Sequence, residues 1–364
     1  MSAQDPVLAR LIDHVNSARA HEAPLDIRGG GSKLFYGEPA VGEPLDVACL
    51  AGISSYEPTE LVVTVRGGTR LLDLEAALRE HGQCLPFEPP RFAPGGTVGG
   101  MVAAGLSGPA RASVGSVRDH VLGVTLLNGR GEILTFGGQV AKNVAGYDVS
   151  RLMAGSLGIL GVICEVSLKV LPISTATATL CFDCDEAQAL AKFRDWASQP
   201  LPISATAWQA GRLHVRLAGA RAAVAAACTR LDGAPLAPEQ AESWWNAVRD
   251  QSLEFFALGA AGLARGEALW RLSLPATAAA LELPGRQFIE WNGAQRWWVT
   301  SAAAGQVRGA AARSGGHAAL LRGADKSSGV FMPLGDVSMR IHRGLKQAFD
   351  PAGIFNRGRL YAGL

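Results

Sequence analysis

Glycine placement is the feature of this 364-residue chain that most constrains its fold. The window 94–161 holds 16 of the 44 glycines in 68 residues. These glycines follow neither a three-residue period nor a low-complexity tract, which excludes collagen-like chains and flexible linkers. Because glycine lets a backbone turn sharply or approach another group closely, the cluster predicts a segment built around such contacts.

Composition narrows the class of protein further. Charged residues make up 18% of the chain and apolar residues 48%, with a formal net charge of +2. That balance predicts an ordered globular protein with no overall attraction to nucleic acid or to a membrane surface. Sparse charge is typical of a chain with a buried partner interface, and equally of a genome biased toward alanine and arginine. No apolar run reaches the ~18 residues of a membrane span, and no secretory signal pattern is present, so we expect a cytoplasmic protein.

The cysteines do not predict a metal site. Six are present, and a single pair, Cys181 and Cys184, has the CxxC spacing, without a second pair or nearby histidines. In a cytoplasmic chain this pattern favours two packed thiols over a zinc or redox site.

Tryptophan placement divides the chain near residue 172. All eight tryptophans follow residue 195, whereas the glycine-rich segments precede residue 172. We therefore expect a domain boundary near residue 172. Residues 128–131, Asn-Gly-Arg-Gly, are typical of a hairpin turn. The second segment mixes strands and helices without a strict βαβ rhythm, which favours helices on one face of a largely antiparallel sheet.

Apolar spacing also predicts the individual elements. The expected strands are 25–27, 61–65, 121–127, 132–136, 160–171, 175–182, 205–208, 213–217, 270–274, 288–291 and 297–300. The expected helices begin at Pro6 and lie at 71–81, 185–197, 220–231, 276–281, 302–313 and 335–349.

The segment Arg28–Lys33, Arg-Gly-Gly-Gly-Ser-Lys, is a candidate anion site. Three glycines after a strand allow successive N–H groups to converge, while Ser32 adds a hydroxyl and Lys33 a cation. Neither the GxxxxGK[ST] nor the GxGxxG pattern is present, and an ordinary glycine turn is the alternative.

Two later glycine-rich segments are also candidates for contact with a ligand. Pro94–Gly105 has paired glycines at a spacing of four, which suit either a closely approaching ligand or tight helix packing. Residues 142–148 precede Gly155–Ile163, where exposed backbone could lie along an adenine or a ribose.

With these three segments in order, the chain resembles the vanillyl-alcohol oxidase and p-cresol methylhydroxylase (PCMH) flavoproteins. Further matches are Gly115 and Asp119, and the tail 345–360, in which Arg357 stands where the family has proline. The resemblance implies an α+β fold, with a two-subdomain PCMH-type FAD-binding domain (1–172), an α+β cap domain with a largely antiparallel sheet (173–334), and a C-terminal helix and tail that return to the FAD domain (335–364). By position it implies FAD ligands at Gly29, Gly30, Gly31, Ser32, Lys33, Gly95, Gly96, Thr97, Gly99, Gly100, Asp119, Gly158, Gly161, Val162 and Ile163.

The manner of flavin attachment also follows from the resemblance. Many relatives bind FAD covalently through the histidine of an Arg-x-Gly-Gly-His motif, but Ser32 occupies that position here. We therefore expect non-covalent FAD. Residues 313–317 spell the same motif in the cap segment, where a helix end followed by a strand would also produce it.

Within this superfamily the chain is similar to the FAD-binding E subunits of bacterial glycolate oxidases. That resemblance implies a small 2-hydroxy acid substrate, a flavoprotein D subunit, an iron–sulfur F subunit, and peripheral membrane attachment through the complex. The chain has no cysteine cluster for an iron–sulfur centre of its own. A non-catalytic assembly subunit and a stand-alone oxidase of another hydroxy compound remain alternatives. Oxidation of a hydroxy acid needs a base and a cation, for which His317, Arg322 and His342 are the candidates.

Overall fold

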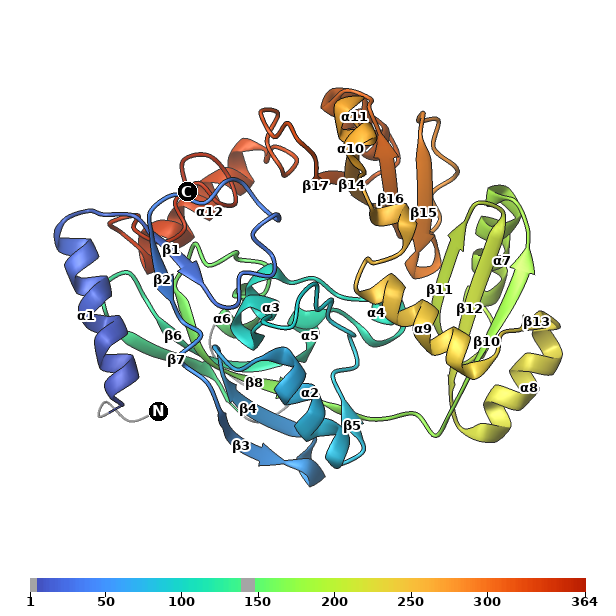
Figure 1. The fold of residues 1–364 in the computed structure, drawn as a ribbon, viewed down its shortest axis with the longest axis horizontal. Helices are drawn as coiled ribbons and strands as arrows, with labels where there is room; N and C mark the ends of the chain where they lie inside the picture. The colour runs from blue at the N-terminus through green and yellow to red at the C-terminus, as the bar shows by residue number, and fades with distance from the viewer. Residues whose placement is uncertain (1–4, 139–147) are drawn as a thin grey trace.

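The computed structural model describes residues 5–138 and 148–364. Figure 1 shows two units side by side, with the C-terminal segment returning to the first unit. The first unit contains α1 (Pro6–Ala20), β1 (Leu25–Arg28), β2 (Glu43–Asp46), β3 (Ile53–Glu57), η1 (Pro58–Glu60), β4 (Val62–Arg66), α2 (Leu71–Glu80), β5 (Gln83–Cys84), α3 (Val98–Ala104), α4 (Arg111–Val114), α5 (Val117–His120), β6 (Val121–Leu127), β7 (Ile133–Gly137), α6 (Val149–Leu152), β8 (Val162–Lys169) and β9 (Leu171–Pro172).

The core of the first unit is a five-stranded antiparallel sheet in the order β3-β4-β8-β6-β7. Every residue of β6 is buried, which explains its continuous apolar run. The predicted hairpin is confirmed, since Leu127 of β6 pairs with Ile133 of β7. The side chain of Asn128 holds the turn by accepting hydrogen bonds from the N–H groups of Arg130 and Glu132.

The second unit is built on an eight-stranded antiparallel sheet in the order β13-β10-β12-β11-β15-β16-β14-β17. The expected α+β class with a largely antiparallel sheet is confirmed. The elements from β10 onward are β10 (Ala176–Asp183), α7 (Glu186–Ala197), β11 (Ile203–Gln209), β12 (Arg212–Gly219), α8 (Arg221–Leu231), β13 (Ala234–Pro235), α9 (Pro238–Arg249), η2 (Glu254–Phe256), α10 (Ala260–Ala264), β14 (Ala268–Ser273), β15 (Arg286–Glu290), η3 (Trp291–Gly293), β16 (Gln295–Thr300), α11 (Ala304–Arg313), β17 (His317–Arg322) and α12 (Asp336–Phe349).

Helices cover both faces of this sheet rather than one. Residues of α7 and α8 pack with Trp208 and Ile289 on one face. On the other face, Trp245 of α9 packs with Phe288 and with Leu106 of the first unit. The spacing of Ala241, Trp245 and Val248 and the proline at the first helical position could have revealed α9, which the sequence analysis did not assign.

The helix expected at 276–281 is absent from the structure. The backbone carbonyls of Ala278 and Ala279 accept hydrogen bonds at 2.8 and 2.9 Å from the guanidinium of Arg296. Arg296 is fully buried, and the irregular segment directs these two carbonyls at its guanidinium, whose buried N–H groups require acceptors. This tertiary demand overrides the local helix propensity of the alanines.

The C-terminal segment packs on the first unit. The N–H of Leu25 donates to the carbonyl of Ile354 at 2.7 Å, and residues 25 and 355 form a parallel bridge. Buried Lys346 of α12 forms an ion pair with buried Asp350 at 2.7 Å and donates to the carbonyl of Ile159 at 2.8 Å. Within residues 5–138 and 148–364, no helix is long and apolar enough to span a membrane.

Candidate functional site

Two glycine-rich loops pack against each other in the first unit, one after β1 and one before α3. A Cβ atom on Gly30 would lie 1.5 Å from the carbonyl oxygen of Gly95. A Cβ atom on Gly29 would lie 2.2 Å from Oγ1 of Thr97. Since no Cβ fits at these distances, the contact between the two loops requires glycine at both positions.

The first loop, residues 29–33, has backbone donors to offer to a ligand. None of its N–H groups donates a hydrogen bond to another residue in the described part of the chain. Such N–H groups in a glycine turn form a site for an anion such as a phosphate. The loop lines a cavity, here called the glycine cradle, whose other lining residues are Asp26, Ile27, Arg28, Leu34, Tyr36, Thr97, Gly100, Ala103, Ala104, Leu157, Asn356 and Arg359. The carboxylate of Asp26 is paired with Arg28.

Lys33 adds a cation to the cradle. Its Nζ lies 3.3 Å from Oγ of Ser32 and 5.8 Å from the centre of the Phe92 ring. Burial lowers its pKa to about 8, and no carboxylate among the described residues opposes that effect. A phosphate would supply the missing negative charge, so the cradle fits the pyrophosphate of FAD.

The C-terminal tail fixes the shape of the cradle. The side chain of Asn356 accepts a hydrogen bond from the N–H of Ile27 at 2.7 Å and donates to the carbonyl of Leu157 at 2.6 Å. Arg359 donates to two carbonyls in the segment 34–36 at 2.9 and 2.7 Å. The tail therefore ties the loop after β1 to the segment before β8.

A second cavity of about 500 Å³ lies between the first unit and the sheet of the second. Its charged lining residues, among those described, are Arg111, Arg118, Arg271 and His317, without a carboxylate. We call it the basic cavity. Arg271 donates a hydrogen bond at 3.2 Å to the hydroxyl of Tyr36, which lines the glycine cradle. The two cavities therefore adjoin each other.

The positive charges of the basic cavity act on one another. Burial, followed by the charge of Arg271, lowers the pKa of both Arg111 and His317. A histidine whose pKa lies below 6.5 is neutral at pH 7 and can accept a proton. The cavity thus combines cations suited to a carboxylate with a potential base.

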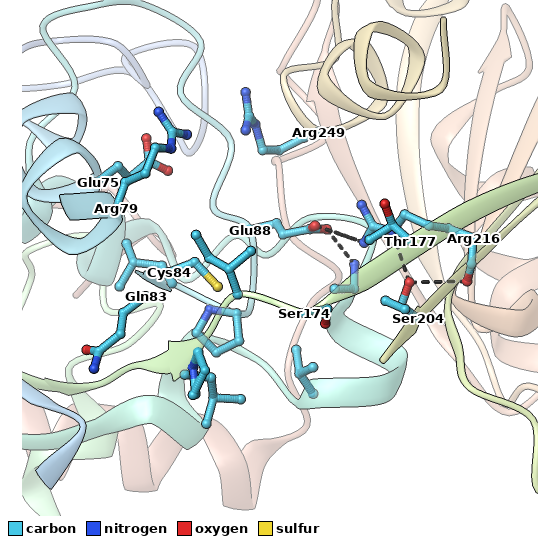
Figure 2. A pocket seen from close by; sticks show the side chains of 18 of the residues that line it. Glu75, Arg79, Gln83, Cys84, Glu88, Ser174, Thr177, Ser204, Arg216 and Arg249 are labelled. Carbon is cyan, nitrogen blue, oxygen red and sulfur yellow. Dashed lines mark hydrogen bonds and ion pairs between the residues drawn. The ribbon is translucent and has the colours of Figure 1, made fainter. Parts of the chain in front are cut away.

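A third pocket, of about 440 Å³, lies where β12 and α9 meet the first unit (Figure 2). Its charges compensate one another, since Arg216 pairs with Glu88 at 2.8 Å and Arg91 with Glu75 at 2.7 Å. Figure 2 shows the bond between Glu88 and Arg216 bridging the two units. The Glu88–Arg216 pair connects the units, the Glu75–Arg91 pair lies within the first unit, and together they leave no excess charge comparable to that of the basic cavity.

Part of the predicted cofactor set lines the glycine cradle, namely residues 29–33, Thr97 and Gly100. Gly95 belongs to the contact between the two loops. Gly96 and Gly99 also lie in close backbone contacts, since a Cβ on Gly99 would lie 2.9 Å from the carbonyl oxygen of Gly67.

The remaining predicted ligands lie elsewhere in the first unit. The Asp119 carboxylate accepts hydrogen bonds from the N–H and hydroxyl of Ser116 at 2.8 Å. Gly158 and Gly161 precede β8, and the side chains of Val162 and Ile163 are buried in the sheet core. Contact of these residues with a cofactor stays a prediction, and most of the segment 142–148 lies outside the described residues.

The three candidate catalytic residues are far from equivalent. His317 lines the basic cavity at the start of β17. Arg322 stacks on the ring of Phe35 at 4.5 Å, and His342 on α12 bonds to the carbonyl of Ser338 at 2.8 Å. Neither Arg322 nor His342 lines the glycine cradle or the basic cavity.

Sequence reasoning did not single out Arg111 or Arg271. The available signal for Arg271 was a charged residue between Trp270 and Leu272 in an otherwise apolar strand.

Comparison with known proteins agrees with this geometry. A family model described as "FAD binding domain" matches residues 8–137. The chain is 46% identical over 354 residues to the glycolate oxidase subunit GlcE of Escherichia coli (strain K12), covering 97% of both chains. It is 32% identical over 162 residues to the glycolate oxidase subunit GlcD of Bacillus subtilis (strain 168), covering 44% of this chain and 34% of that protein.

The fold also has a solved counterpart. The structure of an alkyldihydroxyacetonephosphate synthase superposes with a TM-score of 0.68 at 15% identity, covering 96% of this chain and 75% of the other. At that identity the likeness concerns the fold alone. The family match over nearly the whole chain and the FAD binding domain model together show that the chain is an FAD-dependent oxidoreductase of the glycolate oxidase subunit GlcE family.

Proposed function

We propose that this chain is the FAD-binding subunit of a glycolate oxidase complex that oxidises glycolate to glyoxylate and passes the electrons to an iron–sulfur partner. The observation that carries the proposal is the glycine cradle. The N–H groups of residues 29–33 donate to no other described residue, Lys33 adds a cation, and the C-terminal tail holds this loop in place. The likeness to GlcE over 97% of both chains supports the choice of complex.

In this proposal the FAD is held without a covalent bond. The described residues that line the glycine cradle include no histidine or cysteine, and Ser32 stands where many relatives carry histidine. Residues 29–33 hold the pyrophosphate through backbone N–H groups and Lys33. The bound flavin supplies a two-electron acceptor, while the chain binds the substrate, orients it and takes up its hydroxyl proton.

The partners in the proposed complex are a D-type flavoprotein and an F-type iron–sulfur subunit, and its location is the cytoplasm at the inner face of the membrane. The likeness to GlcD, another subunit named for glycolate oxidase, supports a multisubunit assembly. Because this chain lacks a cysteine cluster in its sequence, electrons leave it through a partner.

The test starts from the purified chain, alone and with the D-type subunit. We expect a yellow protein that releases about one FAD per chain on acid precipitation and whose flavin is bleached by glycolate under anaerobic conditions. A colourless protein that takes up no FAD would contradict the proposal. Bleaching that appears only after addition of the D-type subunit would favour the non-catalytic assembly role, and bleaching only by another alcohol would favour a stand-alone oxidase.

A further inference from the structure

We propose that the basic cavity is this chain's own substrate site, in which Arg111 and Arg271 bind the carboxylate of a short 2-hydroxy acid and His317 accepts its hydroxyl proton. This inference rests on the proposed function, because it needs FAD in the adjoining glycine cradle. It assigns the chemistry to this chain rather than to a partner subunit.

The first argument is an excess of positive charge, which Asp119 offsets only from beyond ion-pair distance of Arg111 and Arg118. Within the described residues, no carboxylate lies within ion-pair distance of Arg111, Arg118 or Arg271, although twelve ion pairs form elsewhere. The nearby carboxylate of Asp119 is bonded to Ser116. Because like charges around one cavity repel one another, a bound anion stabilises such a cluster, most of all at half-buried Arg271.

The second argument is that Arg111 is held in place. Its guanidinium lies 4.5 Å from the centre of the Trp291 ring, and the indole N–H of Trp291 donates to the carbonyl of Gly108 at 3.0 Å. This arrangement joins the end of a cap strand to the loop that precedes Arg111. A cation fixed over an indole face keeps its N–H groups available at its edge for a carboxylate.

The backbone beneath this contact is unusual. Trp291 and Asn292 have φ values of 53° and 54°, in the left-handed region that non-glycine residues rarely adopt. Thr206 holds them there, since its hydroxyl donates to Oδ1 of Asn292 at 3.0 Å and accepts from the N–H of Asn292 at 2.9 Å. Strain maintained by dedicated hydrogen bonds is characteristic of functional sites, and here it presents the Trp291 ring to Arg111.

The third argument is position. Arg271 is bonded to Tyr36, and Tyr36 lines the glycine cradle, so a carboxylate on Arg271 lies beside the cofactor site. His317 lines the same cavity, and burial and the charge of Arg271 lower its pKa. His317 is placed to accept the hydroxyl proton of the substrate, and FAD bound in the glycine cradle would supply the two-electron acceptor that oxidation to a 2-oxo acid requires.

The experiment measures binding of oxalate, a two-carbon carboxylate that resembles glycolate but has no hydrogen to lose. Calorimetric titration of the FAD-loaded chain gives the Kd, and the flavin absorbance change gives a second readout. We expect Arg271→Met and Arg111→Met to weaken oxalate about ten- to a hundredfold, the usual effect of losing a charge-assisted bond. The matched control is Arg286→Met, which removes an exposed arginine of the same sheet outside the cavity.

Two further variants separate the roles. His317→Gln should bind oxalate as the wild type does, but its flavin should be bleached by glycolate at least a hundredfold more slowly, without the histidine limb of the pH profile. Trp291→Leu should raise the KM for glycolate with little change in kcat, and Trp291→Phe should restore the KM. That rescue would not be expected if Trp291 only supported folding.

The outcomes distinguish this inference from the proposed function. Equal oxalate binding by all arginine variants, or no oxalate binding by an FAD-loaded wild type, would overturn the inference and leave the FAD site standing. Failure of the wild type to take up FAD would overturn the proposed function, and titration of the FAD-free chain with oxalate would then still decide whether the cavity binds carboxylates. Flavin content and thermal midpoints of each variant exclude misfolding.

Discussion

Lys33 allows a test of the glycine cradle in which stability and cofactor binding should change in opposite directions. In the FAD-free chain its ammonium is partly buried without a carboxylate partner, and burial lowers its pKa from 10.5 to about 8. When FAD is bound, a pyrophosphate near the same ammonium compensates the charge. Lys33→Met keeps the apolar stem of the side chain and removes the charge, so the variant should stabilise the empty protein and weaken FAD binding.

The size of the stability effect follows from the pKa. A fall from 10.5 to about 8 corresponds to about 3 kcal/mol of lost folding free energy below pH 8, at about 1.4 kcal/mol per unit. The Phe92 ring, 5.8 Å from Nζ, returns about 0.5–1 kcal/mol to the cation. The FAD-free Lys33→Met chain should therefore be about 2 kcal/mol more stable than the wild type at pH 7.

The lowered pKa of Lys33 also determines whether the stability of the FAD-free chain rises or falls with pH. Between the folded pKa of Lys33, about 8, and its unfolded value of 10.5, the unfolded chain binds more protons than the folded one. The stability of the FAD-free wild type should thus rise with pH in this window, and that of Lys33→Met should not. FAD binding favours the protonated lysine, so its association constant should fall above pH 8, by at most about tenfold per pH unit.

Urea unfolding of the FAD-free chains at pH 7 and pH 9.5, with FAD titrations over the same range, measures both effects. We expect FAD binding to the variant to be about ten- to a hundredfold weaker at pH 7, the loss of one charge-assisted contact. An FAD-free variant that is less stable than the wild type would refute the account of Lys33 as an uncompensated charge. Unchanged FAD affinity would place the pyrophosphate elsewhere.

Three other substitutions test the surrounding framework. Gly30→Ala should abolish FAD retention, because its Cβ would lie 1.5 Å from the carbonyl of Gly95; a wild-type ratio of flavin to protein absorbance would contradict the packing of the two loops. Lys346→Met should lower the free energy of unfolding by about 3–5 kcal/mol, since it leaves buried Asp350 without its partner; a urea midpoint close to that of the wild type would show otherwise. Burial raises the pKa of Glu290 to about 7, so wild-type stability should fall by about 3 kcal/mol between pH 4.5 and pH 7. Glu290→Gln should remove that slope in denaturation at pH 5 and pH 8, and a persisting slope would assign it to another group.

The glycine loops were predictable from the sequence because the constraint on them is local. A position where a Cβ would meet a neighbouring backbone atom admits glycine alone, so Gly30 marks the contact whatever else the chain does. The central strand β6 was predictable for a similar reason, since it is buried throughout and shows a continuous apolar run. The mostly exposed strands β2 and β3 show no such run and were not predicted. The irregular segment at 276–281 was not, because the demand on its carbonyls comes from Arg296, well beyond it in the chain.

The basic cavity could not be assembled from the sequence. Arg111, Arg271 and His317 come from α4, β14 and β17, and no spacing rule joins residues of two units. His317 could be named as a candidate only because imidazoles are few, and the nearby Arg322 was offered as its cation. The structure assigns a different neighbour, since Arg322 stacks on Phe35 whereas Arg271 lowers the pKa of His317.

The C-terminal tail departs from the family pattern at residue 357, and the contacts of that residue show whether the departure affects the glycine cradle. Arg357 replaces the usual proline, but its exposed side chain contacts only the carbonyls of Gly353 and Glu22 at 2.9 and 3.4 Å among the described residues. The flanking Asn356 and Arg359 make the buried bonds to the glycine cradle. Because residue 357 does not line the cradle, arginine there removes none of the contacts that brace it. The bracing depends on Asn356 and Arg359 rather than on residue 357, so this departure from the family pattern leaves the residues that shape the cradle in place.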